Sequence, residues 1–130
     1  MELIVVLDTN GYSDWRRSGR WHECLAIADR VVVPVIVLGE LYHGFRKGSQ
    51  LEQNTARLHE FLSEPQVQVM PTSRRSAEIY GEFLDGLQQR GTPIPTNDVW
   101  IAAMAHECGG RLISRDVHFD FLPQVMRVVG

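Results

Sequence analysis

The sequence predicts an α/β sandwich around a mostly parallel central sheet, and two observations carry this prediction. Short apolar runs alternate along the chain with amphipathic stretches at helical spacing, and the connections between them are short. The chain has 130 residues, a formal net charge of -3 and no biased tract. We therefore expect one globular domain over residues 1–130 and exclude a polycationic nucleic-acid binder.

Strands are predicted where turn residues bound a short apolar run. The run that opens the chain is continuous, which is typical of a central parallel strand buried on both faces. The run at residues 67–70 alternates apolar and polar side chains, as an edge strand does. The predicted strands are residues 3–7, 31–33, 67–70, 112–113 and 126–129.

Helices are predicted where apolar residues recur every three or four positions. Pro34 fits the first turn of a helix, where the missing N–H of proline is not needed. Serine, threonine and asparagine are preferred caps at the other helix starts. The predicted helices are a first stretch that carries Trp15 and continues with Trp21, Cys24, Leu25 and Ala28, then Pro34 to Gly48, Leu51 to Leu62, Ser73 or Ser76 to Arg90, and Thr96 or Asn97 to Gly109.

Four acidic residues occupy positions where carboxylates are unusual. Asp8 directly follows the first buried strand and Asp116 follows another, so both are expected at the carboxyl edge of the sheet, where open α/β sheets bind ligands. Glu40 and Asp98 border the apolar faces of their helices. Isolated buried carboxylates cost several kcal/mol each, so they neutralise, pair with a base or bind a cation. The motifs around these acids contain no Lys or Arg beside them except Arg115, which favours a cation.

Each acid also has an ordinary explanation. Asp8 fits the start of an Asx turn, Asp98 fits a first-turn acid, and Asp116 fits a turn residue. Glu40 is harder to explain in this way, because its helix is apolar almost all round. Hard divalent ions prefer carboxylate oxygens and activate water for attack on phosphorus. Together the four acids therefore favour a bound metal ion that activates water for attack on phosphorus.

Motifs in four segments of the chain resemble those of the PIN-domain nucleases and, among them, the VapC-type toxins of bacterial and archaeal toxin–antitoxin pairs. The segments are Leu7 to Asn10, Pro34 to Leu41 followed by Gly44, Thr96 to Ala103, and Leu112 to Asp116. This resemblance implies a PIN-like α/β/α sandwich with a five-element parallel sheet. It also implies an Mg²⁺-dependent endoribonuclease, with Mn²⁺ as the other candidate ion, that acts as a toxin.

The resemblance also assigns roles to individual residues. Asp8, Glu40, Asp98 and Asp116 match the acidic quartet of the family, which holds the metal and carries catalysis. Asp120 is an alternative fourth acid, although only Asp116 directly follows the buried strand. The residues that look like hydrogen-bonding partners of these carboxylates are Thr9, Asn10, Thr96, Asn97 and Ser114.

Three kinds of partner are expected from the same resemblance: RNA, a small antitoxin protein and a second copy of the chain. The residues expected to contact RNA phosphates, unless they form an ordinary solvated surface, are Arg16, Arg46, Lys47 and Arg115. The residues that form either an apolar groove for a partner or part of the core are Trp15, Trp21, Tyr42 and Phe45. The apolar runs are too short to span a membrane and no signal peptide opens the chain, so a cytoplasmic protein is expected.

Competing functions have weaker support in the sequence. The histidines lack paired zinc spacing, and His118 is expected to cap or pack, although it alternates with Asp116 and Asp120. A haloacid-dehalogenase-like phosphatase would have a second acid where Asn10 stands. A non-catalytic RNA-binding or protein-interaction module on a PIN-like scaffold is expected to have lost an acid, and all four are present.

Overall fold

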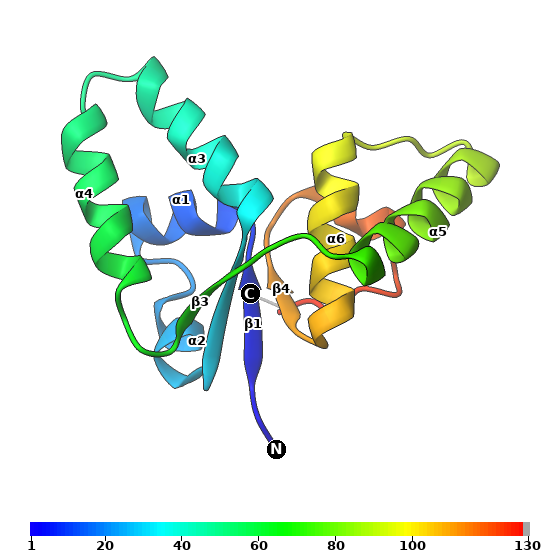
Figure 1. The fold of residues 1–130 in the computed structure, drawn as a ribbon, viewed down its shortest axis with the longest axis horizontal. Helices are drawn as coiled ribbons and strands as arrows, with labels where there is room; N and C mark the ends of the chain where they lie inside the picture. The colour runs from blue at the N-terminus through cyan, green and yellow to red at the C-terminus, as the bar shows by residue number, and fades with distance from the viewer. Residues whose placement is uncertain (129–130) are drawn as a thin grey trace.

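Four short parallel strands form the centre of the computed structural model, which describes residues 1–128 (Figure 1). The strands are β1 (Ile4–Leu7), β2 (Arg30–Pro34), β3 (Val67–Met70) and β4 (Arg111–Ile113), in the spatial order β3-β2-β1-β4. All three pairings are parallel, so the carboxyl ends of the strands meet at one edge of the sheet. The predicted α/β class is confirmed.

β1 occupies the centre of the sheet because its side chains are apolar on both faces. It pairs with β2 on one side and β4 on the other, with Val5 opposite Val31 and Arg111. Val5, Val6 and Leu7 are at most 1% exposed. β3 lies at the edge of the sheet, as its alternating sequence predicts.

Helices cover both faces of the sheet. In Figure 1, α5 and α6 stand on one side and α1, α3 and α4 on the other. α6 is buried almost all round, which makes it the inner helix of its layer. The helices are α1 (Thr9–Ser18), α2 (His22–Ile27), α3 (Val35–Lys47), α4 (Leu51–Leu62), α5 (Arg74–Arg90), α6 (Thr96–Cys108) and a short 3₁₀ helix, η1 (Val117–Phe121). Among the described residues, no helix combines the length and apolar character that crossing a membrane requires.

Two predicted helix boundaries in the first half of the chain are wrong. Pro34 ends β2 opposite Met70, and the helix begins one residue later at Val35. The ψ angle of Pro34 is 140°, which is an extended backbone conformation. A proline at the end of a strand lacks only a hydrogen bond at the margin of the sheet, so it is tolerated there. The first predicted helical stretch divides into α1 and α2, because Gly19 and Trp21 both adopt left-handed backbone conformations.

Helix caps in the second half of the chain follow the sequence only in part. Ser73 caps α5 in a reciprocal capping box with Ser76, as predicted. Neither Thr96 nor Asn97 caps α6. The carbonyl of Pro95 instead accepts the first hydrogen bond of that helix, from the backbone N–H of Asp98 at 3.0 Å.

The predicted last strand is reduced to a single bridge. Leu112 of β4 pairs with Arg127 in parallel, and the backbone N–H of Leu112 donates to the carbonyl of Met126 at 2.8 Å. Val129 lies outside the described residues. The five-element sheet implied by the family resemblance is therefore four strands with one bridge among residues 1–128.

A close approach between α1 and β4 brings the ends of β1 and β4 together. Gly11 lies in the first turn of α1, directly against the carbonyl oxygen of Ile113, and a methyl group on Gly11 would overlap this oxygen. The contact requires glycine because no other residue leaves room for the backbone. Asp8 precedes this turn, so the position of its carboxylate depends on the same contact.

Replacing Gly11 with alanine is expected to destabilise the protein by about 1–3 kcal/mol, because the added methyl group must push β4 away. Urea denaturation followed by circular dichroism measures the change. Gly81→Ala is the matched control, since Gly81 is exposed on α5 with open space around it. That control is expected to gain about 0.5–1 kcal/mol. Equal effects of the two substitutions would contradict the close approach.

Candidate metal-binding active site

Asp8 is buried at the carboxyl end of the central strand. Its side chain is the N-cap of α1, where Oδ1 accepts a hydrogen bond from the backbone N–H of Gly11 at 2.6 Å. The residue is only 3% exposed, and a hydrogen bond with Ser114 also reaches its carboxylate. Asp8 is thus a local cap, as the ordinary explanation holds, and also a buried member of an acidic site.

Glu40 of α3 is connected to the neighbours of two other acids. The hydroxyl of Thr9 donates to Glu40 Oε1 at 2.5 Å, and the amide of Asn97 donates to Oε2 at 3.5 Å. Thr9 follows Asp8 in the chain and Asn97 precedes Asp98. Glu40 therefore lies at the junction of α1, α3 and α6.

Asp116 lies in the loop that follows β4 and is held from two sides. Its backbone N–H donates to Ser114 Oγ at 3.0 Å, and the amide of Asn10 donates to Asp116 Oδ2 at 3.4 Å. Asn10 thus holds a carboxylate oxygen of Asp116, whereas the Ser114 hydroxyl accepts from the Asp116 backbone. Thr96 differs, because it lies exposed at the first position of α6 and its hydroxyl has no carboxylate partner among residues 1–128.

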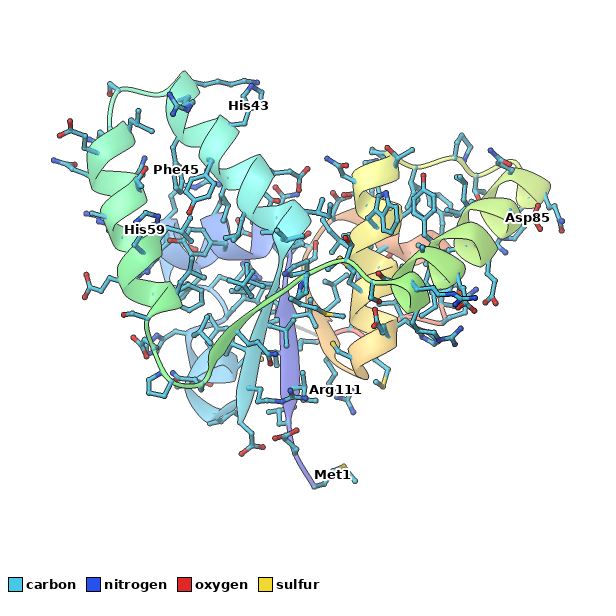
Figure 2. The ribbon with its side chains drawn as sticks, viewed as in Figure 1. Met1, His43, Phe45, His59, Asp85 and Arg111 are labelled. Atoms are coloured by element: carbon cyan, nitrogen blue, oxygen red, sulfur yellow. The ribbon has the colours of Figure 1, made fainter. Side chains whose placement is uncertain are left out.

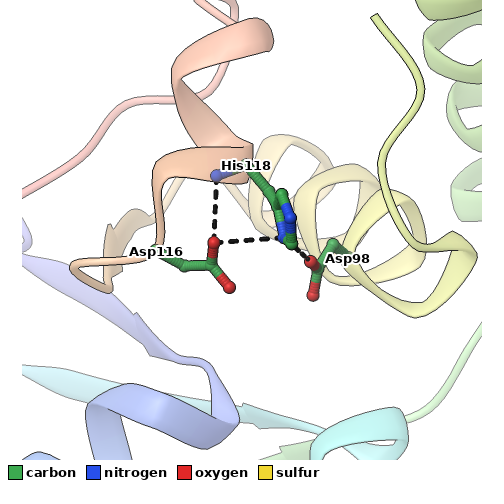
Figure 3. Close-up of side chains that lie close together, drawn as sticks. All are labelled: Asp98, Asp116 and His118. Carbon is green, nitrogen blue, oxygen red and sulfur yellow. Dashed lines mark hydrogen bonds and ion pairs between the residues drawn. The ribbon is translucent and has the colours of Figure 1, made fainter.

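His118 enters the acidic cluster directly, whereas the sequence favoured a capping or packing role for it over a ligand role. Its ring Nδ1 lies 2.8 Å from Asp98 Oδ2 and 3.1 Å from Asp116 Oδ1 (Figure 3). Its backbone N–H also donates to Asp116 Oδ1 at 2.9 Å. The signal in the sequence was the alternation of Asp116 with His118, which places both side chains within one turn of η1.

Asp120 faces a different partner. Its carboxylate forms an ion pair with Arg127, and its side chain is 63% exposed. The same guanidinium donates to the carbonyls of Ser114 at 2.9 Å and Asp116 at 3.2 Å. Arg127 therefore fastens the loop that carries Asp116, and Asp116 is the acid that approaches Asp98 and His118.

The electrostatics of the cluster favour a bound cation. Burial raises the pKa of the Asp8 carboxyl to about 6, and the nearby charges of Asp116 and Asp98 add to this effect. Burial also raises the pKa of Asp98, with Asp116 and Glu40 contributing in the same direction. Donor atoms of Asp98, Asp116 and His118 lie within 4.8 Å of one another. These donors fit a divalent ion, which would offset the cost of the buried charges.

The basic residues expected to contact RNA differ in how they are held. Arg115 forms two hydrogen bonds of 3.0 Å with Asp14, and this guanidinium holds the pKa of Asp14 below its usual value. Arg16 is packed 4.1 Å from the Trp15 ring centroid. Arg46 and Lys47 are exposed in the last turn of α3.

The aromatic residues assigned to either a groove or the core differ in burial. Trp21 is buried in the core, whereas Trp15, Tyr42 and Phe45 are half-buried. Phe45 lies between α3 and α4 in Figure 2, near His59. The Tyr42 hydroxyl and the His59 ring are 3.0 Å apart across the same pair of helices. The core role is therefore confirmed for Trp21, and a partner groove at the other three stays a prediction.

The fold and the site define an α/β protein with a cluster of metal-ligand side chains at the carboxyl edge of a parallel sheet. A sequence profile described as PIN domain matches residues 5–123, and the chain belongs to this family. The PIN nuclease fold is metal-dependent, in agreement with the donor atoms of the cluster.

Individual relatives cover nearly the whole chain. Ribonuclease VapC2 of Rickettsia felis is 30% identical over 130 residues, which are 95% of this chain and 96% of the relative. The structure of VapBC2 from Rickettsia felis bound to a DNA fragment from its promoter has a TM-score of 0.85 at 28% identity, covering 97% of this chain and 98% of that chain. VapBC-1 from nontypeable Haemophilus influenzae has a TM-score of 0.86 at 25% identity, covering 97% of both chains.

Asp8→Asn is expected to stabilise the metal-free protein above pH 6. The folded protein retains the Asp8 proton up to about pH 6, whereas the unfolded chain releases it near 3.8. The folded state therefore binds more protons between these values, and its stability falls as pH rises through them. Asparagine keeps the cap acceptor without a charge, so the gain at pH 7 is on the order of 2–3 kcal/mol.

Urea denaturation in EDTA between pH 4 and pH 8 measures this gain as the difference between wild type and variant. The difference is expected to disappear towards pH 4, and a gain that is independent of pH would contradict the electrostatic explanation. Added Mn²⁺ is expected to stabilise the wild type more than the variant.

Asp116→Asn and Asp120→Asn distinguish the two candidates for the fourth acid. Asp116→Asn removes a charge beside Asp98 and is expected to weaken Mn²⁺ binding about ten- to a hundredfold. Asp120→Asn keeps an oxygen that accepts from Arg127, so a much smaller change is expected. Calorimetric titration of the purified protein with Mn²⁺ measures both. Equal weakening would show that Asp120 shares the role.

Proposed function

We propose that this chain is a metal-dependent endoribonuclease and acts as the toxin of a toxin–antitoxin pair. The observation that carries the proposal is the convergence of Asp8, Asp98 and Asp116, where the charge of Asp116 helps to raise the pKa of both Asp8 and Asp98. Glu40 is joined to this group through Thr9 and Asn97. The relatives named ribonuclease support the RNA substrate, and a structural neighbour from the VapBC family of toxin-antitoxin systems supports the toxin role.

The metal would be held by the carboxylates of Asp8, Glu40, Asp98 and Asp116, with Mg²⁺ or Mn²⁺ as the ion. Carboxylate oxygens are the ligands that both ions prefer. When bound, such ions supply an activated water for attack on phosphorus and stabilise the leaving oxygen of an in-line displacement. This proposal assigns catalysis to the acidic cluster and needs no nucleophilic side chain.

The polar neighbours of the acids would fix the direction of each carboxylate. Thr9 and Asn97 hold the two oxygens of Glu40, and Asn10 holds one oxygen of Asp116. Ser114 contacts both Asp8 and the backbone of Asp116. Side chains that are restrained in this way lose little freedom when an ion binds, which favours affinity.

RNA contacts are proposed for Arg16, Arg46, Lys47 and Arg115. Arg46 and Lys47 lie six and seven residues after Glu40 on α3, roughly 10 Å along the helix axis. Arg115 is adjacent to Asp116, and Asp14 holds its guanidinium near the site. Arg16 is proposed to contact RNA only with the face that Trp15 leaves free.

The proposed protein partner is a small antitoxin. Several structural neighbours are complexes of a toxin with its antitoxin, and two of those are bound to DNA. The half-buried Trp15, Tyr42 and Phe45 offer apolar surface between the helices for such a partner. Self-association into a homodimer stays a prediction from the family resemblance.

Asp98→Asn is expected to lower RNA cleavage at least about a hundredfold, because it removes a charged donor from the proposed metal site. Cleavage of total RNA by the purified protein, with Mg²⁺ or with EDTA, measures the loss and maps the cut ends. Asp85→Asn is the matched control, since Asp85 is exposed on α5 (Figure 2). Full activity of Asp98→Asn, or cleavage in EDTA, would refute the proposed function.

A further inference from the structure

His118 connects two acids that come from different parts of the chain. Asp98 belongs to α6, and Asp116 precedes η1. The ring Nδ1 of His118 lies between them, 2.8 Å from one carboxylate oxygen and 3.1 Å from the other (Figure 3). The His118 side chain is 39% exposed, whereas those of Asp98 and Asp116 are 16% and 18% exposed. The three donor atoms are therefore reachable by an ion from solvent.

The position of the ring is set by the backbone around it. The N–H of His118 donates to Asp116 Oδ1, and the neighbouring Phe119 is 1% exposed in the core. Arg127 fastens the same loop through the carbonyls of Ser114 and Asp116. His118 is thus held beside the acids by contacts that do not involve its ring.

Hydrogen bonding by the His118 ring does not fully satisfy both neighbouring carboxylates. Nδ1 carries at most one proton, so a single N–H is shared between two carboxylates. Adjacent ligand atoms around an octahedral divalent ion are about 3 Å apart when each lies about 2.1 Å from the ion. The distances of 2.8 Å and 3.1 Å match this spacing. One ion would therefore satisfy all three donors together.

We propose that His118 Nδ1 is a ligand of the metal together with Asp98 and Asp116, and that it makes the site prefer Mn²⁺ to Mg²⁺. The inference rests on the proposed function, and it adds a donor outside the acidic quartet. Mg²⁺ takes oxygen donors almost exclusively, whereas first-row transition ions also accept imidazole nitrogen. Among these ions, Mn²⁺ shares with Mg²⁺ the preference for carboxylates that Asp98 and Asp116 provide.

His118→Asn separates coordination from hydrogen bonding. The asparagine amide nitrogen lies close to the place of Nδ1 and donates hydrogen bonds to both carboxylates, but it does not replace imidazole as a nitrogen ligand. Calorimetric titration of the purified full chain with Mn²⁺ and with Mg²⁺ gives the two affinities. Pulsed electron paramagnetic resonance of the Mn²⁺-loaded protein detects a coordinated nitrogen. His43→Asn is the matched control, because His43 is exposed on α3 (Figure 2).

Wild type and His43→Asn are expected to bind Mn²⁺ more tightly than Mg²⁺ and to show nitrogen coupling. In His118→Asn, Mn²⁺ binding is expected to weaken about ten- to a hundredfold, Mg²⁺ binding to change much less, and the nitrogen coupling to disappear. Unchanged coupling, or equal weakening for both ions, overturns the inference.

Asp98→Asn in the same titrations keeps the two proposals apart. If Asp98→Asn loses metal binding while His118→Asn retains nitrogen coupling, only the role of His118 is refuted. If Asp98→Asn binds Mn²⁺ as tightly as wild type, the proposed function and the ligand set that includes His118 are refuted together.

Discussion

A carboxylate held almost out of water at the end of the central strand is the constraint on which the rest of the site depends. Asp8 is 3% exposed, and burial raises its pKa to about 6. It is held there because α1 starts immediately after β1 and packs against β4 through Gly11. The same contact brings Ser114 to Asp8. A cation at this edge of the sheet would offset the free-energy cost of burying the Asp8 charge.

The remaining acids are arranged around Asp8 by hydrogen bonds between neighbouring elements. Thr9 and Asn97 connect Glu40 of α3 with α1 and α6, and Asn10 connects α1 with Asp116. Because each link joins a different pair of elements, the site assembles only when the sheet and its flanking helices are in place. Carboxylates placed close together oppose folding while they stay uncompensated, which is a common compromise between stability and function.

Most elements could be predicted because their local signals agree with the tertiary structure. β1 is apolar on both faces and β3 alternates, so their central and edge positions follow from pattern alone. Predictions were wrong where a residue is compatible with two positions in secondary structure. Pro34 is acceptable in the first turn of a helix and at the end of a strand, and pairing with Met70 decided between them. Asn97 is a good cap, but Glu40 accepts a hydrogen bond from its side chain.

The sequence by itself selected the candidate carboxylates, because Asp8 and Asp116 follow buried strands and Asp98 and Glu40 border apolar helix faces, and it left Asp120 as an alternative to Asp116. Only the tertiary structure placed Asp116 beside Asp98, paired Asp120 with Arg127 and brought His118 into the cluster. Asp120 turns to Arg127, while His118 reaches Asp98, 20 residues earlier in the chain. The partners of Asp120 and His118 depend on how η1 and the C-terminal segment pack against α6 and β4. The spacing of residues within the loop does not predict that packing.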